Sequence, residues 1–270
     1  MSLVNTNWLE ENLNKVKIID SSWHMPNVNR NANQEYIQEH IPKSIFFDID
    51  KYSNLETDLP HMLPSANDWE KIVSSLGISN NDKIIIYDNS DVLSSCRCWY
   101  NFIYFGHDPD LVSVLDGGFK KWKLEKKIVT NEKTKIFKSK YKSQENRELV
   151  KNKNQIDENV NKQEFIVIDA RGKERFEGKI PDPRKNVRSG SIPNSFCIPY
   201  KEIVNENNTF KTIEEISKKF DEITETNIKN RVFSCGSGIT ACVLALAYSL
   251  VNNKYSPTIY DGSWAEYGKI

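Results

Sequence analysis

The feature that most constrains this 270-residue chain is an internal repeat, because its two halves show the same series of motifs in the same order. An apolar run ending in aspartate occurs as VKIID at 16–20 and as FIVID at 165–169. The matched positions are separated by nearly constant distances: 149 residues for Asp20 and Asp169, 151 for Pro42 and Pro193, 147 for Asp88 and Cys235, and 145 for Asp116 and Asp261. Such spacing predicts a duplicated domain.

Each half has the element pattern of an α/β fold. Short runs rich in β-branched residues alternate with longer amphipathic stretches, such as 69–76 and 213–220. This alternation predicts two tandem domains, each a mainly parallel sheet flanked by helices. We place the first domain at 1–138 and the second at 155–270. The segment 139–154 is expected to be a linker, because this part of the chain is rich in Lys and Asn and poor in large apolar residues.

The composition limits the kinds of partner that the chain can bind. Lys plus Arg equals Asp plus Glu at 37 each, so no overall charge attracts nucleic acid or an acidic membrane surface. No apolar run reaches the length of about 18 residues that crosses a bilayer, and the N-terminus does not resemble a secretory signal, so we expect a cytoplasmic protein. The five cysteines form no paired C-x-x-C set, which argues against a metal site or a disulfide framework.

The segment RVFSCGSGITACVLALAYSL at 231–250 carries the clearest chemical signal. It predicts a buried strand, a glycine-containing loop and a helix, with Cys235 at the turn from strand to helix. Gly236 and Gly238 allow the loop to curl tightly, so that several backbone N–H groups and the positive end of the helix dipole face one sulfur. Such a loop would stabilise a thiolate or a persulfide. The alternative is that Cys235 is a small buried hydrophobic residue, as we expect for the other four cysteines.

The loop CGSGITAC at 235–242 resembles the active-site loop of 3-mercaptopyruvate sulfurtransferases, which are members of the rhodanese superfamily. Further motifs resemble that family in order and spacing: DSSWHMP at 20–26, HIPKSIFFDID at 40–50, HMLP at 61–64, KERFEG at 173–178 and YDGSWAEYG at 260–268. The resemblance covers nearly the whole chain. It implies two tandem rhodanese folds, of which the first has lost its cysteine, and here Asp88 stands at the position equivalent to Cys235.

The resemblance also implies the members of the site. They are a nucleophile and a Ser-His-Asp proton relay drawn from both domains. Two arginines hold the carboxylate and ketone oxygens of the substrate, and the remaining loop residues also bind the substrate. The matching positions are Cys235; Ser237, His61 and Asp50; Arg175 and Arg184; and Gly236, Gly238, Ile239 and Thr240. A guanidinium can bind a carboxylate through two hydrogen bonds, which suits arginine to this task. Neither a metal nor an organic cofactor is implied.

The expected activity is transfer of sulfur from 3-mercaptopyruvate, through a Cys235 persulfide, to thioredoxin, a small thiol or cyanide. One alternative keeps the fold but uses thiosulfate, whose dedicated enzymes resemble this family but carry basic side chains directly after the cysteine; here Gly236 and Ser237 follow it. Phosphate ester hydrolysis is a second alternative, but related phosphatase loops are a residue longer and contain arginine. A third is a binding module without activity. One departure from the family pattern is the loop at 88–97, which is about two residues shorter than usual.

Overall fold

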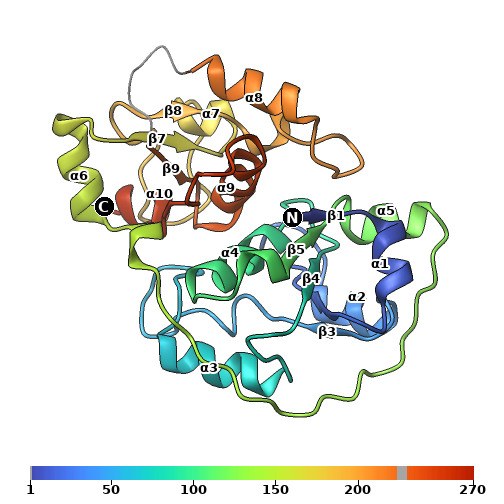
Figure 1. The fold of residues 1–270 in the computed structure, drawn as a ribbon. Helices are drawn as coiled ribbons and strands as arrows, with labels where there is room; N and C mark the ends of the chain where they lie inside the picture. The colour runs from blue at the N-terminus through green and yellow to red at the C-terminus, as the bar shows by residue number, and fades with distance from the viewer. Residues whose placement is uncertain (1, 224–229) are drawn as a thin grey trace. The chain divides into compact units, whose positions relative to one another are not determined.

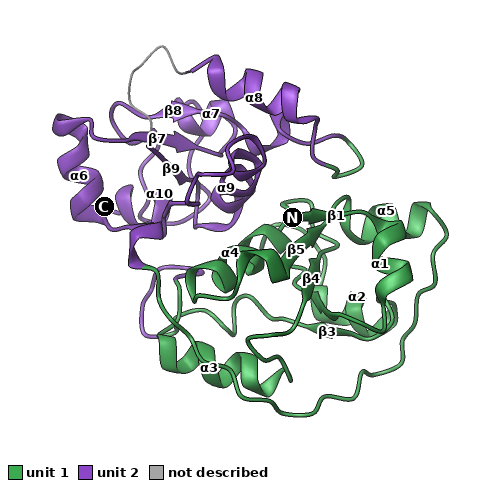
Figure 2. Cartoon of the chain, viewed as in Figure 1, with its two compact units in different colours: residues 1–55, 63–146, 206–209 green, residues 56–62, 147–205, 210–270 purple. Residues whose placement is uncertain are grey.

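The computed structural model describes residues 2–223 and 230–270, which form two compact units (Figures 1 and 2). Unit 1 contains the chain up to residue 55 together with 63–146 and 206–209. Unit 2 contains 56–62, 147–205 and 210–270. Each unit therefore includes one short segment from the opposite half of the sequence, 206–209 in unit 1 and 56–62 in unit 2.

Unit 1 is built on a five-stranded parallel sheet with the strand order β1-β5-β4-β2-β3. Its strands are β1 (Leu3–Val4), β2 (Lys17–Asp20), β3 (Ser44–Phe46), β4 (Ile84–Tyr87) and β5 (Val112–Leu115). Its helices are α1 (Thr6–Asn12), α2 (Ala32–Gln38), α3 (Ala66–Ser75), α4 (Ser95–Tyr104) and α5 (Gly118–Leu124), with a 3-10 turn at Pro109–Leu111.

Unit 2 repeats this topology, with the strand order β6-β10-β9-β7-β8 in a second parallel sheet. Its strands are β6 (Val150–Lys151), β7 (Ile166–Asp169), β8 (Phe196–Cys197), β9 (Arg231–Ser234) and β10 (Ile259–Tyr260). Its helices are α6 (Lys153–Lys162), α7 (Lys173–Phe176), α8 (Ile213–Asp221), α9 (Ile239–Val251) and α10 (Ser263–Tyr267), with 3-10 turns at Arg147–Leu149 and Tyr200–Glu202.

The identical strand order of the two sheets confirms the expected fold class of two parallel sheets flanked by helices. Parallel sheets are covered on both faces, so their central strands are continuous apolar runs, as in the fully buried IIIY of β4. Each unit has a core of its own, which includes Ile85 and Trp122 in unit 1 and Val232 and Trp264 in unit 2.

β1 and β6, each at one edge of its sheet, were not predicted from the sequence, because each has only two residues and shows no periodicity. β6 lies in the segment 139–154 that we expected to be a linker, and it pairs with β10. In the described ranges, 2–223 and 230–270, no helix combines the length and the apolar character that crossing a bilayer requires.

Candidate functional site

Cys235 follows directly on the buried central strand β9, where ligands bind in sheets of this kind. Cys235 is 2% exposed, and α9 begins four positions later at Ile239. Between them, Gly238 has a φ of +80°, in the left-handed region that favours glycine. The structure thus has the expected order of strand, tight loop and helix. Ile239 and Thr240 form the first turn of α9, the former buried and the latter half-buried.

The first turn of α10 holds the Cys235 loop in place. The backbone N–H of Trp264 donates to the carbonyl of Cys235 at 3.0 Å, and that of Ala265 donates to the carbonyl of Gly236 at 2.9 Å. The Ser263 hydroxyl accepts from the Cys235 amide at 3.2 Å and lies 4.0 Å from Sγ. The sequence analysis did not propose Ser263, although the motif around it closes both halves of the repeat, and that repetition was the available signal.

The two predicted arginines meet beside the Cys235 loop. Arg175 lies in α7 and Arg184 in the segment that follows it. A Cβ placed on Gly236 would lie 3.3 Å from Nη2 of Arg184 and 3.6 Å from Nη2 of Arg175. Glycine at position 236 therefore lets both guanidinium groups approach the residue next to the cysteine, whereas the sequence analysis expected these cations to lie at a distance from the loop.

A carboxylate that the sequence analysis missed connects these arginines. Arg175 Nη2 donates to Asp182 Oδ2 at 2.7 Å, and Arg184 Nη1 donates to Oδ1 at 3.3 Å. Burial by itself would raise the pKa of Asp182, but the Arg184 amide and the two guanidinium groups outweigh it and hold the pKa below its ordinary value. Arg175 Nε is buried and has no hydrogen-bond partner within residues 2–223 and 230–270, so it remains able to donate to a ligand.

His61 belongs to unit 2, although it comes from the first half of the sequence. Its Nδ1 lies 3.0 Å from the Ser237 hydroxyl and 3.2 Å from the Ser237 carbonyl, and both residues are 7% exposed. His61 also has a φ of 61°, a backbone conformation that costs free energy and is common at functional sites. The structure therefore brings together two members of the expected relay.

Asp50, the third expected member, belongs to unit 1. Its carboxylate accepts from the indole N–H of Trp23 at 3.1 and 3.0 Å, both residues being in the same unit. Its link to His61 stays a prediction.

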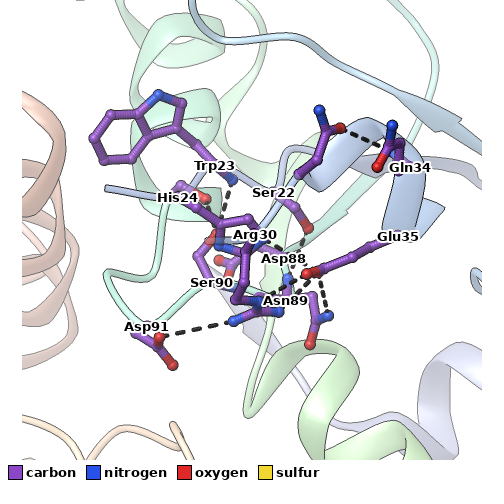
Figure 3. Close-up of polar contacts among 12 residues, drawn as sticks. Ser22, Trp23, His24, Arg30, Gln34, Glu35, Asp88, Asn89, Ser90 and Asp91 are labelled. Atoms are coloured by element: carbon purple, nitrogen blue, oxygen red, sulfur yellow. Dashed lines mark hydrogen bonds and ion pairs between the residues drawn. The ribbon is translucent and has the colours of Figure 1, made fainter. Parts of the chain in front are cut away.

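The equivalent loop of unit 1, after β4, is shown in Figure 3. Asp88 takes the place of the cysteine, and its buried carboxylate accepts from the amide of Ser90 at 2.9 Å and from that of Ser95, the first residue of α4, at 2.8 Å. Arg30 reaches this loop and donates to the carbonyl of Asn89 at 3.0 Å. The same guanidinium donates twice to Glu35, whose Oε2 also accepts from the Asn89 amide group. The carboxylates of Asp88 and Glu35 thus accept hydrogen bonds from this loop.

In the described part of the chain, no group of three or more His, Cys, Asp or Glu side chains could hold a metal ion. Comparison with known proteins agrees with the fold. The Rhodanese-like domain model matches residues 5–125 and 152–269. A solved structure of a 3-mercaptopyruvate sulfotransferase from Escherichia coli superposes with a TM-score of 0.87 at 29% identity, covering 98% of this chain and 99% of that one.

Two curated relatives extend this similarity. The "Thiosulfate/3-mercaptopyruvate sulfurtransferase 1, mitochondrial" of Arabidopsis thaliana is 37% identical over 98% of this chain and 75% of its own length. The bovine "Thiosulfate sulfurtransferase" is 35% identical over 98% of this chain and 91% of its own length. With both domain matches, nearly complete coverage and a cysteine in the expected loop of the second unit, the chain belongs to the tandem rhodanese-domain sulfurtransferases.

Proposed function

We propose that this chain transfers sulfur from 3-mercaptopyruvate to a thiol through a persulfide on Cys235. The observation that carries the proposal is the position of two guanidinium groups beside Gly236, the neighbour of the nucleophile. Two such groups can bind the carboxylate and ketone oxygens of a 2-oxo acid. The Nε of Arg175, which has no hydrogen-bond partner in the described part of the chain, would add a further donor. The sulfur at the other end of this substrate would then face the Cys235 loop.

The transfer step needs a thiolate and an acceptor for the electrons of the broken bond. The Cys235 thiolate attacks the sulfur of mercaptopyruvate, a new S–S bond forms, and the C–S bond breaks with its electron pair moving into the enolate of pyruvate. The loop amides and the N-terminal end of α9 stabilise the anionic sulfur before and after the step. Guanidinium groups that hold the ketone oxygen would stabilise the enolate as its charge develops.

The pair of Ser237 and His61 is suited to the proton transfer that completes the step. Their contact at 3.0 Å is within the range for proton transfer between a hydroxyl and an imidazole. A proton delivered to the enolate carbon gives pyruvate and leaves Cys235 as a persulfide. Asp50 would orient His61 in this scheme, as the family pattern implies.

In the second half of the reaction, a thiolate takes the outer sulfur and restores Cys235. A small thiol, thioredoxin or cyanide can each perform this attack, and we propose a thiol as the acceptor. Cytoplasmic location remains a prediction, and the Arabidopsis relative is named as mitochondrial.

Thiosulfate is the second candidate donor, because a relative named for it is nearly as similar as the one named for both donors, at 35% and 37% identity. Thiosulfate is a small dianion that would lie entirely within the loop. Gly236 and Ser237 provide no cation there, and the two guanidinium groups beside Gly236 are suited to bind the separate carboxylate and ketone of mercaptopyruvate. The geometry therefore favours mercaptopyruvate.

The test compares pyruvate and sulfide release from mercaptopyruvate, with a thiol acceptor, against sulfur transfer from thiosulfate to cyanide. The variants are Cys235→Ser and, as a matched control, Cys197→Ser, because burial raises the pKa of Cys197 to about 12 and so makes its thiol unreactive. We expect mercaptopyruvate to be preferred, with activity lost only in Cys235→Ser. Preference for thiosulfate would overturn the donor assignment, and activity in Cys235→Ser would overturn the mechanism.

A further inference from the structure

Asp182 lies between the two arginines, and within residues 2–223 and 230–270 its carboxylate forms ion pairs only with them. Its side chain is 1% exposed, whereas those of Arg175 and Arg184 are 22% and 28% exposed. Besides accepting from both guanidinium groups, its Oδ1 accepts from the Arg184 backbone amide at 3.0 Å. A single carboxylate therefore fixes the direction of both cations and also cancels part of their charge.

The charge that a substrate meets here follows from these contacts. Two guanidinium groups contribute two positive charges, and the Asp182 carboxylate removes one. Within the described residues, 2–223 and 230–270, Asp182 is the one carboxylate paired with either arginine. Gly236 and Ser237 add no charge from the loop. The set of Arg175, Arg184 and Asp182 thus presents one net positive charge beside Cys235.

We propose that Asp182 is a specificity-determining residue, which matches the site to a monoanionic sulfur donor and disfavours a dianionic one. The inference rests on the proposed function and extends it to the choice between mercaptopyruvate, with one carboxylate, and thiosulfate, with two negative charges. A fixed negative charge repels a dianion about twice as strongly as it repels a monoanion at the same distance. Removing this charge, without moving the arginines, should therefore favour thiosulfate more than mercaptopyruvate.

The experiment measures kcat/KM for both donors, with cyanide as the common acceptor, in wild type and Asp182→Asn. Asparagine has the same shape and keeps an oxygen that accepts from the Arg184 amide. We expect the ratio of thiosulfate to mercaptopyruvate kcat/KM to rise about tenfold, after allowing for solvent screening at these part-exposed groups, mainly through a lower KM for thiosulfate. Asp182→Ser removes the same charge with a smaller side chain and should shift the ratio in the same direction.

Two controls separate charge from structure. Asp182→Glu keeps the charge, so its ratio of thiosulfate to mercaptopyruvate kcat/KM should stay within about threefold of the wild-type ratio. Glu177→Gln removes a carboxylate that is paired with Lys179 on the surface of the same segment, and it should not shift the ratio because exposed charges are screened.

The outcomes distinguish this inference from the proposed function. If Asp182→Asn and Asp182→Ser weaken both donors equally, Asp182 only holds the arginines in place and the inference fails. A wild-type preference for thiosulfate would overturn the proposed donor. The inference about Asp182 would still be tested in that case, because the ratio in each variant is compared with the ratio in wild type.

Discussion

Two loops at the same place in the repeated fold differ in what occupies them. The loop after β4 in unit 1 spans residues 88–94, seven positions, while the loop after β9 in unit 2 spans 235–238, four positions. In both, the first carbonyl accepts from an early residue of the last helix in the unit, from Phe119 in unit 1 and from Trp264 in unit 2. The scaffold is therefore shared, whereas the first side chain of the loop is a carboxylate in unit 1 and a thiol in unit 2.

The difference shows how a duplicated site can lose its chemistry and keep its fold. The Asp88 carboxylate accepts from the first amide of α4, so a side chain of the protein itself occupies the anion position at the start of this helix. The Arg30 guanidinium beside the loop is likewise held by Glu35. In unit 2, the equivalent arginines leave the Nε of Arg175 without a partner among residues 2–223 and 230–270. The Arg30 guanidinium is thus paired within unit 1, whereas the Nε of Arg175 in unit 2 is available to a ligand only if one reaches it.

The largest effect is expected when Cys235 in unit 2 is replaced by aspartate, the residue that stands at the equivalent position, Asp88, in unit 1. Cys235→Asp should lower kcat/KM by at least about 1,000-fold, because a carboxylate cannot form a persulfide and removing a nucleophile costs this much or more. Intact-protein mass spectrometry after incubation with mercaptopyruvate should show no added sulfur. The reciprocal double variant Asp88→Cys with Cys235→Ser should also stay inactive, because its loop is longer and its arginine is occupied by Glu35. Sulfur transfer by that double variant would contradict the comparison.

Much of this contrast could be predicted from the sequence. The spacing of 147 residues between Asp88 and Cys235 indicated the duplication. The glycine loop after Cys235, together with the family resemblance, predicted that the second copy is the catalytic one, because a strand followed by a glycine loop has a strong local pattern. Arg175 and Arg184 were identified from the family resemblance. Their contact with Gly236 could not be derived from sequence, since it depends on how the segment after α7 folds back on the loop.

The missed residues share one property, which is that their roles depend on tertiary contacts. Asp182 in PDPR has the pattern of a turn, and nothing local shows that its carboxylate contacts two guanidinium groups. The assignment of His61 to unit 2 is likewise a long-range effect, because its partner Ser237 is 176 positions away. The edge strands β1 and β6 are too short to show any periodicity.

The second effect concerns the two short segments that belong to the unit of the opposite half of the sequence, 56–62 in unit 2 and 206–209 in unit 1. His61 contacts Ser237 in unit 2, and Asn208 donates to the carbonyl of Ser90 at 3.2 Å in unit 1. His61→Asn should lower kcat with mercaptopyruvate about 100-fold, because the proposed proton transfer loses its imidazole. Steady-state kinetics checks this, and the matched variant Asn208→His should leave kcat unchanged. An unaltered kcat in His61→Asn would remove the imidazole from the mechanism.

The third effect is on stability. Asp88→Ala should lower the free energy of unfolding by about 2 kcal/mol, because it leaves the buried amides of Ser90 and Ser95 without acceptors. Cys235→Ala removes only a small thiol and should cost about 1 kcal/mol. Urea denaturation followed by circular dichroism compares the two. If Cys235→Ala proves the more destabilising, the carboxylate does not have the structural role that we assign to it in unit 1.

The smallest effect is a pH dependence at Asp20, at the end of β2. Asp169, at the end of β7, is paired with the Arg171 guanidinium at 2.8 Å, and Asp20 accepts instead from Ser22. Burial raises the pKa of Asp20 to about 6, with a smaller contribution from the charge of Asp88. The folded state then binds a proton more tightly at Asp20 than the unfolded state does, so this residue adds stability at acid pH that is lost as the pH rises through about 6. Between about pH 5 and pH 7.5 the loss should be about 1.4 kcal/mol. Asp20→Asn cannot titrate, so its free energy of unfolding minus that of wild type should increase by this amount over the same range, as urea denaturation at several pH values can measure. A constant difference between the two proteins would mean that Asp20 has the same affinity for its proton in both states, and that its burial at the end of β2 is offset by its hydrogen bonds from Ser22.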